Sequence, residues 1–246
     1  MRIVFSRKGF DSAAGGGPSP IIDGRPVSLP IPDSKGLSRA TYGDCGLGEL
    51  VATASRGRLS ASDLCHHDPM FLPGDRCVFG QCGGAQTHLD RNGVTIGDVF
   101  LFFGWFRSEE EGDHHRIFGY LRIEEIVRLA DCGEAKRQEF AELGHPHAFG
   151  FHHPNRSDTL YAGTGVAASE ASGRLRLSRE GMTRTHWRVP EWLGKVGLSY
   201  HRGANRWPAP DHLVSVAQGQ EFVADIGTEA EPREWLDGII RAIRKS

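Results

Sequence analysis

The chain has 246 residues, of which 39% are hydrophobic and 24% charged, and its formal net charge is −2. This balance is typical of a folded protein large enough to bury a sizeable core, and it excludes a disordered chain and a protein that coats duplex DNA through positive charge. Because no apolar run approaches the length of a membrane span and the five cysteines lack a disulfide-like spacing, we expect a cytoplasmic protein with reduced thiols and no membrane contact.

The first ninety residues predict short strands separated by glycine-rich loops. Residues 2–6 are apolar enough for a buried strand, and a loop with four glycines follows. The Asp-Gly dipeptide at 23–24 lies between apolar stretches and predicts a hairpin. Residues 46–54 predict a short helix with Asp44 as its N-cap, and residues 79–93 predict a second glycine-rich loop.

The middle of the chain has the strongest strand signals. Residues 95–106 are almost entirely apolar, and residues 115–127 continue with period-two alternation, so we expect two adjacent antiparallel strands joined by an acidic loop. Residues 134–143 predict an amphipathic helix. Five later segments predict further short strands: 159–164, 174–179, 185–190, 198–201 and 219–226.

The last fifteen residues predict a helix with one apolar face, because Trp235, Ile239, Ile240 and Ile243 recur at helical spacing. The order of all elements predicts an α+β protein built on a bent mixed or antiparallel sheet, or a small barrel, with peripheral helices. We expect a single domain, 1–246, in which residues 159–246 could form a sub-lobe.

The first candidate ligand site is the glycine-rich loop after the first strand. Its bare backbone could approach a phosphate or a sugar, Arg7 and Lys8 would neutralise an anion, and the hydroxyls of Ser12 and Ser19 add hydrogen bonds. Asp11 is the candidate general base. The order of residues in a Walker loop is missing, however, and an ordinary surface loop would have the same composition.

The second candidate lies in the glycine-rich region at 79–93. The amide groups of Gln81 and Gln86 offer paired donors and acceptors that match the edges of bases, and His88 could act as a general acid or base. A polar loop that crosses the surface explains the same residues equally well. Both interpretations therefore stay open.

Two segments combine potential metal ligands without a recognisable ligand spacing. Residues 63–69 include a cysteine and two histidines, and Cys77 and Cys82 follow, but neither a CxxC nor an HxxxH pattern occurs. Residues 145–153 include four histidines interrupted by proline and glycine. Histidines hydrogen-bonded in turns and buried cysteines are the simpler interpretation, so we expect no metal ion.

Aromatic residues accompany a basic segment, 174–206, in the C-terminal part of the chain. Aromatic rings among arginines suit stacking on single-stranded or flipped-out bases, with salt-sensitive binding and a preference over duplex DNA. Core packing is the more common use of tryptophan. The rings concerned are Trp187, Trp192, Tyr200 and Trp207.

Several common catalytic signatures are absent. The sequence has no GxSxG, HExxH or GxGxxG motif, and it lacks the HxE and PCxxC elements of nucleobase deaminases. These absences exclude the commonest hydrolases, zinc proteases, dinucleotide-dependent enzymes and deaminases.

Three segments resemble a known family. The sequences SRKGFDSAAGGGPSPI at 6–21, FGQCGGAQTHLDRNGVTIGDVFLFFGWFR at 79–107 and HWRVPEW at 186–192 are similar to the nucleotide-modification-associated domain proteins of the third type. The resemblance covers nearly the whole chain and implies a role in base modification of bacterial or phage DNA, with modification-system proteins as partners. It supplies no catalytic residues. Residues 97–106 and 117–127 also resemble barrel strands of PUA-like and EVE-like domains, which read modified bases.

These features are consistent with three functions. The first is an enzyme or accessory enzyme that acts on a nucleotide or DNA base, with Asp11 and His88 in acid–base roles and Gln86 against the base. The second is a non-catalytic reader of a modified base, and the third is a structural subunit of a modification or defence complex. The sequence does not identify a cofactor. For the first function we expect the loops at 8–19 and 81–88 to converge on one pocket.

Overall fold

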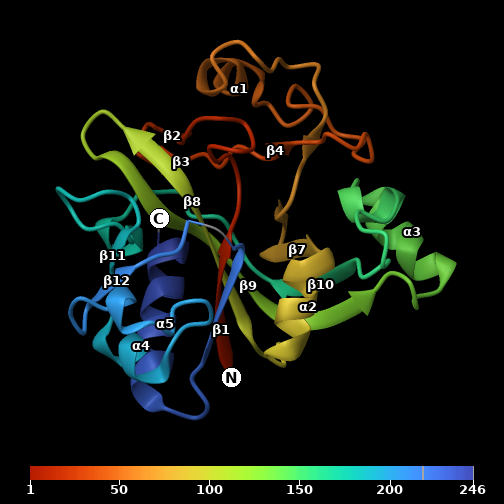
Figure 1. Cartoon of the computed structure of the whole chain (residues 1–246). Coiled ribbons are helices and arrows are strands. Elements are labelled where there is room, and N and C mark those ends of the chain that lie inside the picture. The colour runs from red at the N-terminus through yellow and green to blue at the C-terminus, as the bar shows by residue number, and fades with distance from the viewer. Residues whose placement is uncertain (218, 246) are drawn as a thin grey trace.

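A nine-stranded mixed sheet forms the centre of the computed structural model, which describes residues 1–217 and 219–245 (Figure 1). The strand order is β13-β1-β8-β9-β10-β7-β6, and β2 and β3 extend the sheet from β8. The strands are β1 (Arg2–Arg7), β2 (Ser19–Ile22), β3 (Arg25–Pro26), β4 (Ile31–Pro32), β5 (Cys65–His66), β6 (Met70–Leu72), β7 (Arg76–Gln81), β8 (Val99–Ser108), β9 (Gly112–Arg128), β10 (Thr159–Thr164), β11 (His186–Arg188), β12 (His212–Val214) and β13 (Glu221–Asp225).

The helices lie around this sheet (Figure 1). Within the described residues none of them is long and apolar enough to cross a membrane. They are α1 (Gly48–Ala54), α2 (Gly83–Arg91), α3 (Glu134–Glu142), α4 (Glu191–Val196) and α5 (Ala230–Arg244), with short 3-10 helices η1 (Pro146–Phe149), η2 (Gly173–Leu175) and η3 (Ala204–Arg206).

Strands β8 and β9 form a long antiparallel hairpin, which confirms the prediction made from their sequence pattern. Strand β1 runs parallel to β8, with Ile3 opposite Val99, so the sheet is mixed. The Asp-Gly hairpin at 23–24 also forms, between β2 and β3. The sheet is not closed. The structure therefore confirms the α+β class with a mixed sheet, and the barrel alternative is not formed.

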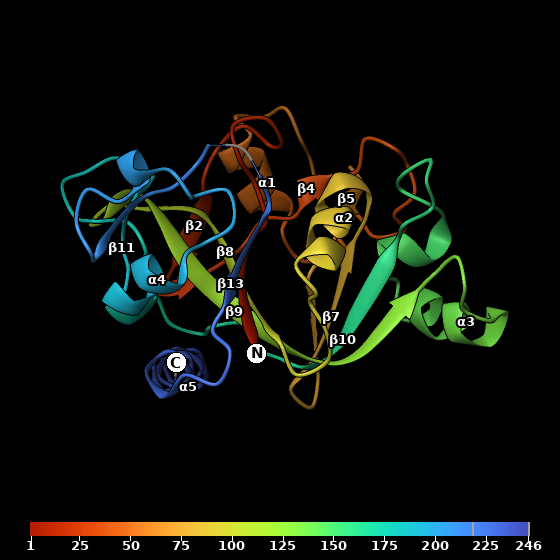
Figure 2. The same ribbon diagram turned by 60° about the horizontal axis from the view of Figure 1, so that its bottom comes forward.

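Different parts of the chain cover the two faces of the sheet. Successive residues of a strand point to opposite faces. Ile3 and Phe5 accordingly join a core that includes α4 and α5, whereas Val4 joins a core with Phe79 and Leu89, the latter from α2. Figure 2 shows α5 and α2 on opposite sides of the central strands. The predicted C-terminal helix is thus present as α5, packed through its apolar face.

Helix α2 replaces most of the second glycine-rich loop expected from the sequence. Gly83 has a φ of +61°, which glycine adopts without strain, and it turns the chain from β7 directly into the helix. Leu89, fully buried, anchors α2 on the sheet. The loop prediction failed because the paired glycines concealed a short helix that begins at them.

Helix α1 begins at Gly48, two residues later than predicted, and Asp44 is not its N-cap. The Asp44 carboxylate instead accepts hydrogen bonds from the backbone N–H and the hydroxyl of Thr41, at 2.9 and 2.7 Å. Aspartate side chains often close such local turns in place of capping a helix. The carboxylate is therefore used by the turn that precedes α1.

The C-terminal part contains fewer strands than predicted. Residues 174–179 form η2 and isolated pairs, and residues 198–201 form a turn. Helix α4 and strand β12 were not predicted. Strands β10 and β13 agree with the sequence prediction, and both join the main sheet. The segments at 174–179 and 198–201, which were predicted as strands, pair with no continuous strand among the described residues.

Candidate functional site

A cavity of about 950 Å³ lies between the first loop, the N-terminal end of α2 and the histidines near η1. This volume is in the range of small-molecule sites in proteins. The glycine-rich loop at 8–19 and the segment 81–88 both contribute to it, so the two segments meet at one cavity. Of the predicted catalytic and ligand-binding residues, those that line it are Arg7, Lys8, Asp11, Ser12, Gln81 and His88.

The two cations of the first loop are already engaged by the protein. The Arg7 guanidinium donates to the carbonyl oxygens of Ala217 at 2.5 Å and Val216 at 2.8 Å. The Lys8 Nζ lies 2.8 Å from the Glu221 Oε1. The charge of Lys8 is therefore balanced by Glu221, whereas Arg7 bonds neutral carbonyl oxygens and keeps its net positive charge. Of the two cations, Arg7 is the one that can still act as a counter-charge for a phosphate.

Glu221, at the start of β13, is a buried carboxylate that no sequence motif singled out. Its Oε1 accepts hydrogen bonds from Ser6, Lys8 and Gln81 at 3.1, 2.8 and 2.7 Å. Its Oε2 is buried and has no hydrogen-bond partner among the described residues. An unsatisfied carboxylate oxygen is costly in a protein interior, so this atom is suited to receive a ligand group or water. The sequence feature that could have drawn attention to Glu221 is its charged side chain within the predicted strand at 219–226.

Two of the predicted contacts are used inside the protein and do not reach the cavity. Gln86 is buried and exchanges hydrogen bonds with the Tyr161 hydroxyl at 2.9 and 3.1 Å. The Ser19 Oγ is also buried and accepts the Leu29 N–H at 3.0 Å. Ser12, in contrast, is exposed at the cavity. The base contact expected of Gln86 and the ligand contact expected of Ser19 are therefore not available in this arrangement.

Asp11 lies at the cavity, and its carboxylate also shapes the loop. Its Oδ1 accepts the backbone N–H groups of Ala13 and Ala14, both at 2.7 Å. Such an Asx turn fixes the chain reversal that follows the aspartate. Asp11→Asn would keep the oxygen that accepts these N–H groups but remove the carboxylate, whereas alanine would remove both. The asparagine variant therefore tests a role of Asp11 as a base without disturbing the turn.

The N-terminal end of α2 lines the cavity through Cys82, Gly83, Gly84 and Ala85. The side chain of the N-cap residue, Cys82, makes no capping hydrogen bond, and a Cβ placed on Gly84 would meet no atom within 4 Å. The Gly83 N–H is already bonded to the Ser157 Oγ at 2.7 Å. Because a helix N-terminus presents N–H groups and the positive end of the helix dipole, this end of α2 suits an anionic group better than the first loop does.

His88 and Tyr200 form an aromatic pair that lines the same cavity. Their rings stack with centroids 4.3 Å apart and planes 25° apart, and Tyr200 is 52% exposed. The Ser199 hydroxyl accepts the Val223 N–H at 2.8 Å and shares a hydrogen bond with the His88 Nε2 at 2.9 Å. Burial lowers the pKa of His88, so its imidazole is neutral at pH 7. The two stacked rings therefore present an aromatic surface at the cavity, in which His88 holds the exposed Tyr200 ring in place.

The tryptophans of the basic segment are not available for stacking on bases. Trp187 is fully buried and Trp192 is 3% exposed, and both belong to the core around α5. Trp207 packs partly buried against the same core. The stacking role considered for these rings is therefore wrong for Trp187 and Trp192, because their faces are covered by other side chains. Tyr200 is the exposed ring of the group.

Histidines from two distant segments meet on one side of the cavity. One ring nitrogen each from His66, His147 and His152 lies within 4.8 Å of the other two. Their ring centroids are 4.1 to 5.1 Å apart. In the sequence, the segments at 63–69 and 145–153 were separate candidates, and neither has a ligand spacing by itself. Only the fold, which brings β5 beside η1, makes the cluster.

Asp158 orients two of these imidazoles. Its Oδ1 accepts hydrogen bonds from the Nδ1 atoms of His147 and His152, at 2.8 and 3.1 Å, and from the His152 backbone N–H at 2.8 Å. Burial lowers the pKa of His147 to about 3, despite the opposing effect of Asp158. The imidazole is therefore neutral at pH 7.

Asp68 is a second buried carboxylate beside the cluster. Its oxygens lie 3.5 Å from the His145 Nε2 and 3.6 Å from the His66 Nε2, and they accept the Gly80 N–H at 3.1 and 3.2 Å. Burial would raise the pKa of Asp68, but the neighbouring His145 and His66 outweigh it, and its pKa lies below the usual range. A Cβ on Gly80 would lie 2.4 Å from the His147 Cδ2, so glycine is required for the imidazoles to pack here.

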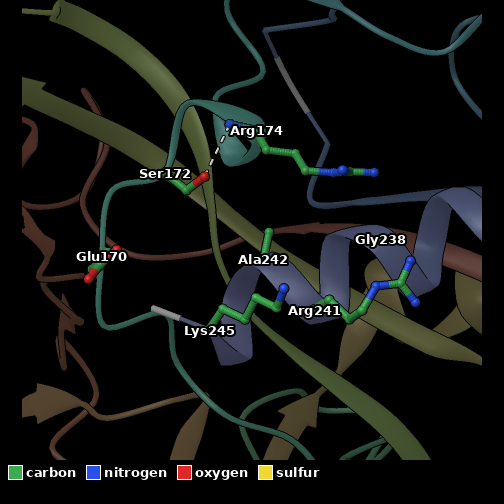
Figure 3. A pocket seen from close by; sticks show the side chains of 7 residues that line it. All are labelled: Glu170, Ser172, Arg174, Gly238, Arg241, Ala242 and Lys245. Carbon is green, nitrogen blue, oxygen red and sulfur yellow. Dashed lines mark hydrogen bonds between the residues drawn. The ribbon is translucent and has the colours of Figure 1, made fainter.

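A second, smaller pocket of about 280 Å³ lies between α5 and the loop before η2. Figure 3 shows Arg174 on the loop side, Arg241 on α5 and Lys245 directly after the helix, with Glu170 nearby. This pocket is basic apart from Glu170, and among the described residues no aromatic or histidine side chain lines it.

Comparison with known proteins identifies the family. A family model described as nucleotide modification associated domain 3 matches residues 2–225. The chain belongs to this family. No curated protein and no solved structure matches it. The resemblance inferred from the motifs is thus confirmed, and it associates the family with nucleotide modification. The residues that line the large cavity all fall within the matched range, whereas most of the small basic pocket's α5 side lies beyond it.

Proposed function

We propose that the protein binds a nucleotide, free or as an unpaired or flipped-out unit of DNA, in the large cavity and modifies it chemically. The observation that carries this proposal is the combination found in one cavity of the family domain: a helix N-terminus, an exposed aromatic ring and a buried carboxylate with an unpartnered oxygen. Each group suits a different part of a nucleotide.

The phosphate is expected at the N-terminal end of α2. The open space at Gly84 lets an anion approach the backbone N–H groups directly, as at other strand–turn–helix phosphate sites. Arg7, which bonds neutral carbonyl oxygens, lies at the same cavity and adds to its positive potential, whereas the charge of Lys8 is balanced by Glu221.

The base is expected against Tyr200. Every base has an aromatic face, so stacking on an exposed tyrosine gives affinity without strict sequence preference. His88 supports this ring from one side and keeps it in place. An unpaired or flipped-out base fits such a site, because a base inside a duplex has no free face.

The chemistry is expected at the carboxylates. Of the carboxylates that line the cavity, Glu221, through Oε2, and Asp11 are our candidate general bases, and His88 is a neutral imidazole within it. A reader of modified bases would use the same stacking surface without turnover. Nucleotide binding together with turnover supports an enzyme, and binding without turnover in the presence of a complete modification system supports a reader.

The phosphate end provides a sharp test, because Gly84 accepts a side chain without a clash. We expect Gly84→Asp to weaken binding of a mononucleotide or a short single-stranded oligonucleotide at least about tenfold, because the new carboxylate repels the phosphate at the helix N-terminus. Gly84→Ala is the matched control and should bind within about twofold of the wild type. Isothermal titration calorimetry measures both. Equal affinity of Gly84→Asp and Gly84→Ala would place the phosphate elsewhere.

A further inference from the structure

The histidine cluster has the properties of a metal site rather than of a packed group of polar side chains. Three imidazoles present ring nitrogens within 4.8 Å of one another, at the wall of the cavity. Imidazole is a preferred ligand of divalent first-row transition metals, and three imidazoles with an open position are typical of catalytic zinc sites. The hydrogen bonds around the cluster indicate which ring nitrogens carry a proton and which have a lone pair available for a metal ion.

Asp158 determines the tautomers of two of the histidines. A carboxylate can only accept, so the Nδ1 atoms of His147 and His152 that contact its Oδ1 carry the protons. Their Nε2 atoms consequently bear the lone pairs. Carboxylate–histidine pairs of this kind are the usual support of metal-bound imidazoles, because they fix the ring and increase its basicity.

The freed nitrogen of His152 makes no hydrogen bond within the part of the chain that the structure describes. This Nε2 is buried, and the side chain is 9% exposed. A buried acceptor without a partner costs free energy, which a bound cation would offset. The nearby Asp68 carboxylate, 3.6 Å from the His66 Nε2, adds the negative charge that favours a cation.

From this geometry we infer that His66, His147 and His152 bind one divalent transition-metal ion, such as Zn²⁺, with Asp158 as positioning residue. Two nitrogens that are each about 2.1 Å from one ion lie at most about 4.2 Å apart, and the three here lie within 4.8 Å of one another, so small ring rotations are enough to complete the site. This inference replaces the expectation of no metal, which rested on spacing within each segment alone.

A bound ion would face the same cavity as Lys8 and Glu221. There it would polarise an oxygen of the substrate or lower the pKa of a bound water. This catalytic use depends on the proposed function, whereas the binding of the ion itself does not.

The test uses the full-length protein after removal of metals with EDTA and then of EDTA itself. We expect Zn²⁺ to bind at one ion per chain with a dissociation constant of about 1 µM or lower. Co²⁺ should produce a visible absorption spectrum of a four- or five-coordinate site. His147→Gln and His152→Gln should each weaken Zn²⁺ binding at least about 100-fold, and Asp158→Asn about 10- to 100-fold.

Controls distinguish this site from incidental binding. His186→Gln alters a histidine that pairs with His212, away from the cavity, and should leave affinity and stoichiometry unchanged. Circular dichroism establishes that each variant is folded; if His147→Gln does not fold, the partly exposed His66→Gln carries the test. Failure of the wild type to bind Zn²⁺ or Co²⁺, or unchanged binding in these variants, would overturn the inference. Because no nucleotide is present, either outcome leaves the nucleotide proposal to its own experiment.

Discussion

Lowering the pH from 7 to 4 is expected to remove about 3 kcal/mol of folding free energy through His201 alone. Burial lowers the pKa of His201 to about 4 in the folded protein, compared with an ordinary value of 6.5. The imidazole must be neutral there, because its Nδ1 donates to the Ser199 carbonyl and its Nε2 accepts the Val216 N–H. As the pH falls through 6.5 the unfolded chain binds the proton first, so stability present above pH 6.5 is lost towards pH 4.

His115 should also reduce the free energy of unfolding as the pH falls. Burial, with smaller contributions from neighbouring arginines, lowers its pKa well below the usual value, and its Nδ1 accepts the Trp187 Nε1–H at 3.0 Å. Denaturant unfolding at pH 7, 6 and 5 measures the loss. His201→Asn should be less stable at pH 7 and should show a flatter dependence on pH. A free energy of unfolding that stays constant between pH 7 and 5 would contradict these assignments.

Glu221→Ala is expected to destabilise the protein by about 3–5 kcal/mol, the cost of breaking a buried ion pair. The change leaves the Lys8 ammonium, whose side chain is 10% exposed, without its counter-charge. It also removes the acceptor of the hydrogen bonds from Ser6 and Gln81. Chemical denaturation at pH 7.5 measures the effect, and the exposed Glu191→Ala on α4 is the matched control.

A double-mutant cycle assigns the loss to the ion pair. Lys8→Met removes the charge but keeps the length of the side chain, so the variant carrying both changes should be less destabilised than the sum of the single changes. Additive effects would show that Lys8 and Glu221 do not depend on each other. In that case the loss would come from the cavity left by the side chain.

The central part of the fold could be predicted because its signals are local. The apolar run of β8 and the period-two pattern of β9 are strong enough by themselves to indicate two adjacent strands. Helix α2 could not be predicted in the same way, since it begins with two glycines, which normally indicate a loop. The strands expected at 174–179 and 198–201 are absent because tertiary packing, and not local pattern, determines short segments.

The site was partly predictable for a similar reason. Polar residues beside glycines in the two loops drew attention to Lys8, Asp11 and His88, which meet at the cavity. The partners that complete it come from elsewhere in the chain and have no local signal: Glu221 lies within an apolar strand, and His66 lies about eighty residues from the histidines that it joins. Gln86 is the opposite case: its amide is suited to base recognition, but in the folded protein it is hydrogen-bonded to the Tyr161 hydroxyl.

Hydrogen exchange of the full-length protein, with and without a saturating short single-stranded oligonucleotide, tests most directly whether the large cavity is the nucleotide site. Binding there should protect backbone amides at 82–88 and 199–201, and Tyr200→Ala should weaken this protection, because stacking on one aromatic ring is worth about 1–3 kcal/mol per base. Amides at 170–174 and 238–245, around the small basic pocket, should not change. Protection confined to the basic pocket, or no protection in either region, would contradict the proposed function.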